Sequence, residues 1–126
     1  MELSYAERFI LMQALIVRRV PAHTRITPQL LLEALQADNE LVMVKTPKLY
    51  FNDGLYNISQ EVDICVEEGL IEDGNSRQIS RAKFAVSLRR TPLGDMFLNS
   101  LGDTLKDALD DMPMSDVGIL DFLSLL

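Results

Sequence analysis

Apolar residues near the start of the chain recur at intervals of three and four, the spacing of one helical face. Ser4 precedes Glu7 by three positions, as in a capping box at a helix N-terminus. The pattern predicts a helix over residues 5–19 that ends before Pro21. Other sides of this helix are apolar too, so we expect it to be buried centrally or to pack against a second subunit. The apolar positions are Tyr5, Phe9, Ile10, Leu11, Met12, Leu15, Ile16 and Val17.

Two further helices are predicted before the middle of the chain ends. Thr27 followed by Pro28 is typical of a helix start, because threonine caps free amides and proline fits the first turn. This second helix should run to about Ala37, and the apolar residues 41–44 predict a short strand after it. Helical spacing resumes over residues 55–68, and Gly69 is typical of the position just past a helix end.

The next segment predicts a β-hairpin. Residues 70–72 begin a strand, residues 73–76 have turn chemistry, and apolar and polar side chains alternate over residues 84–90. Thr91-Pro92 then repeats the helix-start signal, and leucine and phenylalanine follow at intervals of four with Gly102 as a weak point. We expect a mostly α fold with a small β-hairpin.

The net charge of -7 is distributed unevenly along the 126 residues. Residues 1–90 hold eleven basic and twelve acidic side chains, whereas residues 91–126 hold one basic and seven acidic ones. Residues 77–90 contain five basic side chains and no acid, so an acidic protein still carries a local charge of +5. The chain therefore retains a candidate surface for nucleic acid.

Other sequence features limit the classes of protein to which this chain can belong. The length suits a single domain with a real core. The longest apolar run is too short to span a bilayer, and the N-terminus is acidic where a signal peptide is basic, so we expect a soluble, cytoplasmic protein. Phosphate-loop, nucleophile-elbow and zinc-protease motifs are absent from the sequence, so we expect no catalysis, cofactor or metal. Cys65 is predicted to be a core residue and His23 a surface loop residue.

Two short motifs carry a resemblance. Gly69-Leu70-Ile71-Glu72 is followed, after a wing-length segment, by Leu88-Arg-Arg-Thr-Pro-Leu-Gly94. In this order after two or three helices, they resemble the winged helix-turn-helix domain of small bacterial transcription regulators, over about residues 4–101. The resemblance implies that the helix over residues 55–68 lies in the DNA major groove while the loop over residues 73–83 touches the backbone. The implied DNA contacts are Arg77, Arg81, Lys83 and Arg89, with Asn57 and Gln60 as base readers.

The charge of the third helix supports an alternative. We expect it to expose four acids and no base, which opposes both phosphate binding and base readout. The acids are Glu61, Asp63, Glu67 and Glu68. The domain, residues 1–102, is therefore either a DNA-associated, regulator-like protein or an adaptor that binds another protein.

The acidic helical extension, residues 103–126, ends in an apolar segment with partner-binding candidates. These are Val117, Leu120, Phe122 and Leu123. An amphipathic helix of this kind can enter a groove on a partner protein. It can also pack on its own domain or on a second copy, and we expect a homodimer.

Overall fold

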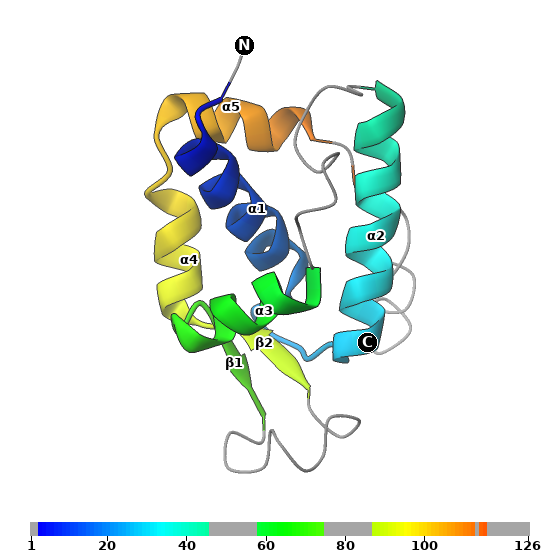
Figure 1. The fold of residues 1–126 in the computed structure, drawn as a ribbon. Coiled ribbons are helices and arrows are strands. Elements are labelled where there is room, and N and C mark those ends of the chain that lie inside the picture. The colour runs from blue at the N-terminus through cyan, green and yellow to red at the C-terminus, as the bar shows by residue number, and fades with distance from the viewer. Residues whose placement is uncertain (1–2, 46–57, 75–86, 113, 116–126) are drawn as a thin grey trace.

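The computed structural model describes residues 3–45, 58–74, 87–112 and 114–115. Within them the chain forms five helices and one two-stranded antiparallel sheet, which confirms the mostly α fold class. α1 runs diagonally through the centre, with α2 and α4 on either side, α5 across one end and the strands at the other (Figure 1). The elements are α1 (Tyr5–Arg19), α2 (Pro28–Lys45), α3 (Ile58–Glu67), β1 (Ile71–Asp73), β2 (Leu88–Arg90), α4 (Pro92–Asn99) and α5 (Asp103–Asp111).

The predicted limits and burial of α1 are confirmed. The Glu7 amide donates to Ser4 Oγ at 3.1 Å, and the Ser4 amide donates to Glu7 Oε1 at 2.9 Å, which completes the capping box. Every residue from 11 to 17 is buried. Helices of the same chain cover this wide apolar surface, because α2, α3, α4 and α5 all contact α1.

Two apolar clusters share α1 as a common wall. The first joins α1 to α2, α3 and the sheet, and its fully buried members include Ile16, Leu31 and Ile71. The second joins α1 to α4 and α5, through Leu11 and Leu15 of α1, Phe97 of α4 and Leu109 of α5. Since α5 packs directly on α1, the start of the acidic extension contributes to the core.

α2 is longer than predicted, and the strand expected over residues 41–44 is wrong. Thr27 does cap the helix, because its Oγ1 accepts the Leu30 amide at 3.2 Å. The helix continues to Lys45. A short apolar run is compatible with either helix or strand, and a helix that is already under way gains one hydrogen bond for each residue added.

The sequence analysis named Gly102 as a weak point of a helix starting at Pro92, and the structure has a break between two helices there. α4 ends at Asn99, and Gly102 is the N-cap of α5, so the spacing-four leucines are divided between two helices. No helix among the described residues is both long and apolar enough to cross a membrane.

The two sequence motifs meet at the base of the sheet. α3 ends in a Schellman motif, in which Gly69 has φ 79° and the Leu70 amide donates to the Cys65 carbonyl at 3.0 Å. Thr91 then bonds to this turn, because its Oγ1 donates to the Gly69 carbonyl at 2.5 Å and its amide donates to the Leu70 carbonyl at 3.2 Å. The end of α3 and the start of α4 are thus joined directly, with the strands between them.

The glycine of the Thr-Pro-x-Gly motif is explained by this junction. The Gly94 amide donates to Thr91 Oγ1 at 3.0 Å, so threonine caps α4 while it also holds the α3 turn. A Cβ at Gly94 would lie 2.3 Å from the Leu70 carbonyl oxygen, inside contact distance. Only glycine lets α4 approach the turn this closely.

Candidate nucleic-acid interface

The outer face of the sheet collects charged side chains from three segments. Glu72 in β1 lies directly opposite Arg89 in β2. The loop between α1 and α2 adds an antiparallel bridge to β2, in which Ile26 and Leu88 exchange backbone hydrogen bonds of 3.0 and 2.8 Å. This bridge places Arg25, the residue before Ile26, beside the strand pair.

Both arginines converge on the same carboxylate oxygen. Arg25 Nη2 lies 3.5 Å from Glu72 Oε1, and Arg89 Nη2 forms a second ion pair with that oxygen. The three side chains are 39 to 44% exposed, so solvent reaches all of them. Arg25 is held along the hairpin as well, because its Nη1 donates to the Ser87 carbonyl at 3.3 Å. The cluster of Arg25, Glu72 and Arg89, which we call the hairpin-base cluster, carries a net charge of +1.

Arg90, the adjacent arginine, has a different setting. Its Nε lies 2.7 Å from Asp95 Oδ1 in the first turn of α4, and its side chain is only 21% exposed. The aliphatic part of Arg90 also lies against Gly94. Arg90 therefore connects the strand to α4, whereas Arg89 faces solvent.

Of the DNA-contact candidates from the sequence, Arg89 and Gln60 lie among the described residues. Arg89 belongs to the hairpin-base cluster, and Gln60 is exposed on the first half of α3. The other candidates, Arg77, Arg81, Lys83 and Asn57, lie outside the described residues.

The sequence pattern predicted that all four acids of the third helix are exposed, and this prediction is wrong for one of them. Glu61 is buried, and Glu68 accepts hydrogen bonds of 3.1 and 3.2 Å from the buried Gln13 amide of α1. Burial raises the pKa of Glu61, and the nearby Glu68 carboxylate raises it further. Asp63, Glu67 and Glu68 are exposed, although Glu68 also makes this contact to α1, so Glu61 is the predicted acid that the structure buries. The helix surface is therefore less acidic than its composition indicates.

Cys65 and His23 lie where the sequence placed them. Cys65 is fully buried in the first apolar cluster, and this burial together with Glu68 and Glu61 raises the pKa of its thiol to about 12. Such a thiol is a poor nucleophile because the reactive thiolate is scarce at neutral pH. His23 is an exposed loop residue. Across the described ranges, no group of three or more potential ligand side chains could hold a metal ion.

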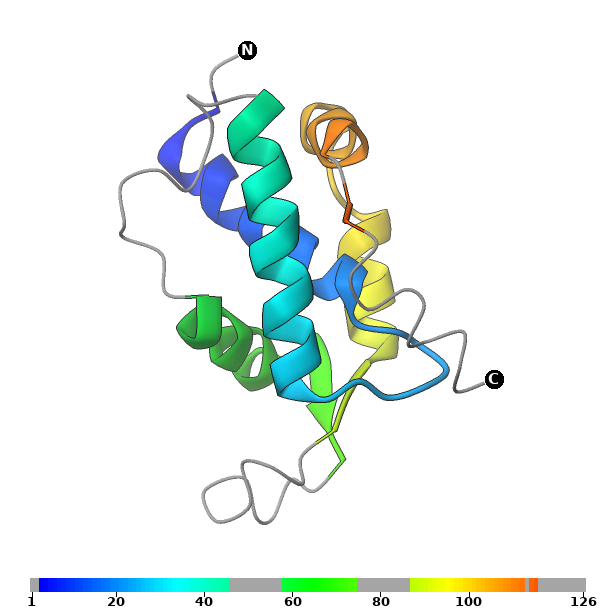
Figure 2. The same ribbon diagram turned by 90° about the vertical axis from the view of Figure 1, so that its right-hand side faces the viewer.

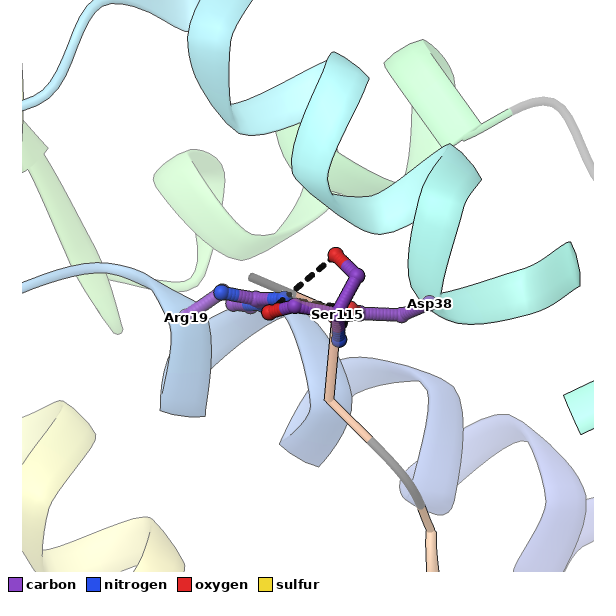
Figure 3. A network of polar contacts seen from close by, with 3 residues as sticks. All are labelled: Arg19, Asp38 and Ser115. Atoms are coloured by element: carbon purple, nitrogen blue, oxygen red, sulfur yellow. Dashed lines mark hydrogen bonds and ion pairs between the residues drawn. The ribbon is translucent and has the colours of Figure 1, made fainter. Parts of the chain in front are cut away.

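The chain after α5 is attached to the domain by a buried polar network (Figure 3). Arg19 at the end of α1 pairs with Asp38 of α2, and their side chains are only 1% and 8% exposed. Arg19 Nη2 also donates to the carbonyl and hydroxyl oxygens of Ser115, at 2.8 and 3.0 Å, and the Ser115 amide donates to Asp38 Oδ1 at 2.6 Å. The partner-binding candidates Val117, Leu120, Phe122 and Leu123 follow Ser115 and lie outside the described residues.

Arg25 is the candidate residue that the sequence reasoning missed. It stands in a loop between Pro21 and Thr27 with no strand pattern around it. Its position depends on the bridge of Ile26 to Leu88 and on its own bond to the Ser87 carbonyl, each across 62 positions, and no local spacing reports such contacts. The sequence feature that could have identified Arg25 was its basic charge next to the apolar Ile26.

Comparisons with protein families, with curated proteins and with solved structures found no match to this chain.

Proposed function

We propose that this protein is a non-enzymatic winged helix-turn-helix protein that associates with double-stranded DNA, like a transcription regulator. The order of elements supports the fold assignment, since α1, α2 and α3 precede the strand pair and α4 follows it. The direct contact between the Gly69-Leu70 turn and Thr91 supports it further, because these are the motifs that carry the resemblance.

The observation that carries the proposal is the hairpin-base cluster. Arg25 and Arg89 come from separate segments and share the outer face of the sheet, and Arg89 belongs to the acid-free sequence 77–90. Guanidinium groups suit phosphate because they offer several donors in a fixed planar fork. The strands lie at the end of the molecule opposite α5, which carries four aspartates and one lysine (Figures 1 and 2). Separation of the basic hairpin from the acidic end lets an anionic polymer approach the hairpin first.

The proposed contact is with the phosphate backbone. α3 exposes Gln60, which suits hydrogen bonding to a base edge, but it also exposes Asp63 and Glu67. Carboxylates repel phosphates, so the hairpin residues Arg77, Arg81, Lys83 and Arg89 provide most of the affinity. Binding of this kind depends weakly on sequence and strongly on salt.

Binding to a random-sequence duplex, measured by fluorescence anisotropy at several salt concentrations, tests the proposal. If three to five cations meet phosphates, log affinity falls with log salt at a slope of about -3 to -5. Arg77→Ala or Arg81→Ala each flattens that slope by about one unit. Lys106→Ala is the matched control, because it removes one exposed positive charge from α5, at the opposite end of the molecule. No binding at about 50 mM salt would contradict the proposal.

The exposed Asp63 and Glu67 favour a second candidate function, an adaptor whose α3 surface and apolar C-terminal segment bind another protein. Deletion of residues 116–126 tests this while retaining Ser115, which belongs to the buried network. Loss of a co-purifying partner from a folded protein supports the adaptor. Conversion of a dimer to a monomer instead identifies the segment as an oligomerisation element.

A further inference from the structure

The hairpin-base cluster holds a negative group where its arginines would meet a phosphate. Glu72 Oε1 lies against Nη2 of both Arg25 and Arg89, so one carboxylate oxygen serves two guanidinium groups. A backbone phosphate presents similar anionic oxygens to arginine. The internal carboxylate and an external phosphate therefore compete for the same donors.

The contacts of Glu72 are of a kind that an external anion can replace. Glu72 Oε1 makes both ion pairs from a side chain that is 39% exposed, so solvent and external anions reach the pairs. All three side chains remain partly exposed, and exposed ion pairs contribute little to stability. Arg25 keeps its bond to the Ser87 carbonyl if Glu72 moves away, so its position does not depend on the carboxylate.

We propose that Glu72 is an intramolecular competitor that occupies the phosphate-binding donors of Arg25 and Arg89 and so limits the affinity of the hairpin for anionic backbone. The inference rests on the proposed DNA-associated function and adds to it how binding is restrained. In the free protein the two arginines are neutralised in part by Glu72. Contact with DNA requires the carboxylate to leave, which keeps the complex weak and readily reversible.

Glu72→Gln tests the inference, since it removes the negative charge and keeps the shape of the side chain. With the random-sequence duplex, we expect the salt slope to become steeper by about one unit, because the net charge of the cluster rises from +1 to +2, and the affinity at about 50 mM salt to rise about tenfold or more. Asp95→Asn is the matched control, because it removes the same charge from the ion pair of Arg90, with an expected change of less than about threefold. The double variant Glu72→Gln/Arg89→Ala should have a slope close to that of the wild type, because its cluster again carries a net charge of +1.

The outcomes separate this inference from the proposed function. If the wild type binds DNA and Glu72→Gln binds equally well, the competitor role is wrong and the DNA-associated function stands. An equal gain in Asp95→Asn also overturns the inference, because the effect is then one of overall charge. If neither protein binds at about 50 mM salt, both proposals fall. If Glu72→Gln binds and the wild type does not, the DNA-associated function of the wild type is wrong, and the inference that rests on it falls as well. Should Glu72→Gln not fold, as judged by circular dichroism, Glu72→Ala is measured with the same expected gain.

Discussion

The buried pair of Arg19 and Asp38 allows a sharp test of what holds the helices and the C-terminal segment together. Asp38→Ala removes the carboxylate that accepts Arg19 Nε at 2.6 Å, and it also removes the acceptor of the Ser115 amide. The Arg19 guanidinium is then left buried with its positive charge uncompensated by Asp38. Removal of one partner from a buried ion pair costs about 3–5 kcal/mol.

That loss is large compared with the total stability of a domain, which is about 5–15 kcal/mol. For a chain of this length, about 1 kcal/mol corresponds to a shift in Tm of about 4 °C, so we expect Tm to fall by about 12–20 °C. Replacement of both partners, in Arg19→Met/Asp38→Leu, removes the buried charge altogether. We expect the double variant to recover most of the lost stability, because apolar pairs of similar size often match a buried ion pair.

Urea unfolding followed by far-ultraviolet circular dichroism measures these free energies. Glu33→Ala is the control, since Glu33 is an exposed acid on the same helix and should change stability by about 0.5 kcal/mol or less. A loss below about 1 kcal/mol in Asp38→Ala would refute the reasoning. The reasoning would also be refuted if the double variant lost as much unfolding free energy as the two corresponding single variants lose together. The lost stability would then come from lost packing and not from an isolated charge.

Three further predictions follow from other contacts. Gly94→Ala should lower the free energy of unfolding by about 3 kcal/mol or more, because the new Cβ meets the Leu70 carbonyl oxygen. Gly102 has open space around it, so Gly102→Ala should lower the free energy of unfolding by about 1 kcal/mol or less in the same urea assay. The Cys65 thiol should react with a chromogenic disulfide reagent only as fast as the protein unfolds, and rapid labelling of the native protein would contradict its burial. Glu61→Gln should gain stability relative to the wild type as pH rises from the ordinary glutamate pKa of 4.5, because burial raises the pKa of the native carboxyl and its ionisation then costs stability that Gln does not lose. A difference in unfolding free energy that stays constant with pH would contradict the last prediction.

Local signals account for the parts of the fold that the sequence predicted well. The capping box of Ser4 and Glu7 and the cap of Thr91 each act within three residues, so the sequence alone reveals them. The end of α3 at Gly69 is similarly local. The strand expected over residues 41–44 failed because a run of four apolar residues does not distinguish helix from strand, and the preceding helix continues through it.

The candidate site depended more on distant contacts. The basic character of the hairpin was visible in the sequence, and Arg89 was identified there. Its pairing with Glu72 required the strand register, and the addition of Arg25 required the bridge from Ile26 to Leu88. The burial of Glu61 likewise depended on how α3 packs, so the predicted four-acid surface was wrong in that part.

The sequence by itself determined the starts of α1, α2 and α4, the glycine stop after α3, the buried central helix and the uneven distribution of charge, because each follows from neighbouring residues or from composition. Only the tertiary structure decided which charges are paired. Arg19 meets Asp38 across 19 positions and Ser115 across 96, and Arg25 reaches Ser87 across 62. Such pairs form after packing has brought distant segments together, and the free energy of an ion pair depends on that burial and not on the spacing of the residues along the chain.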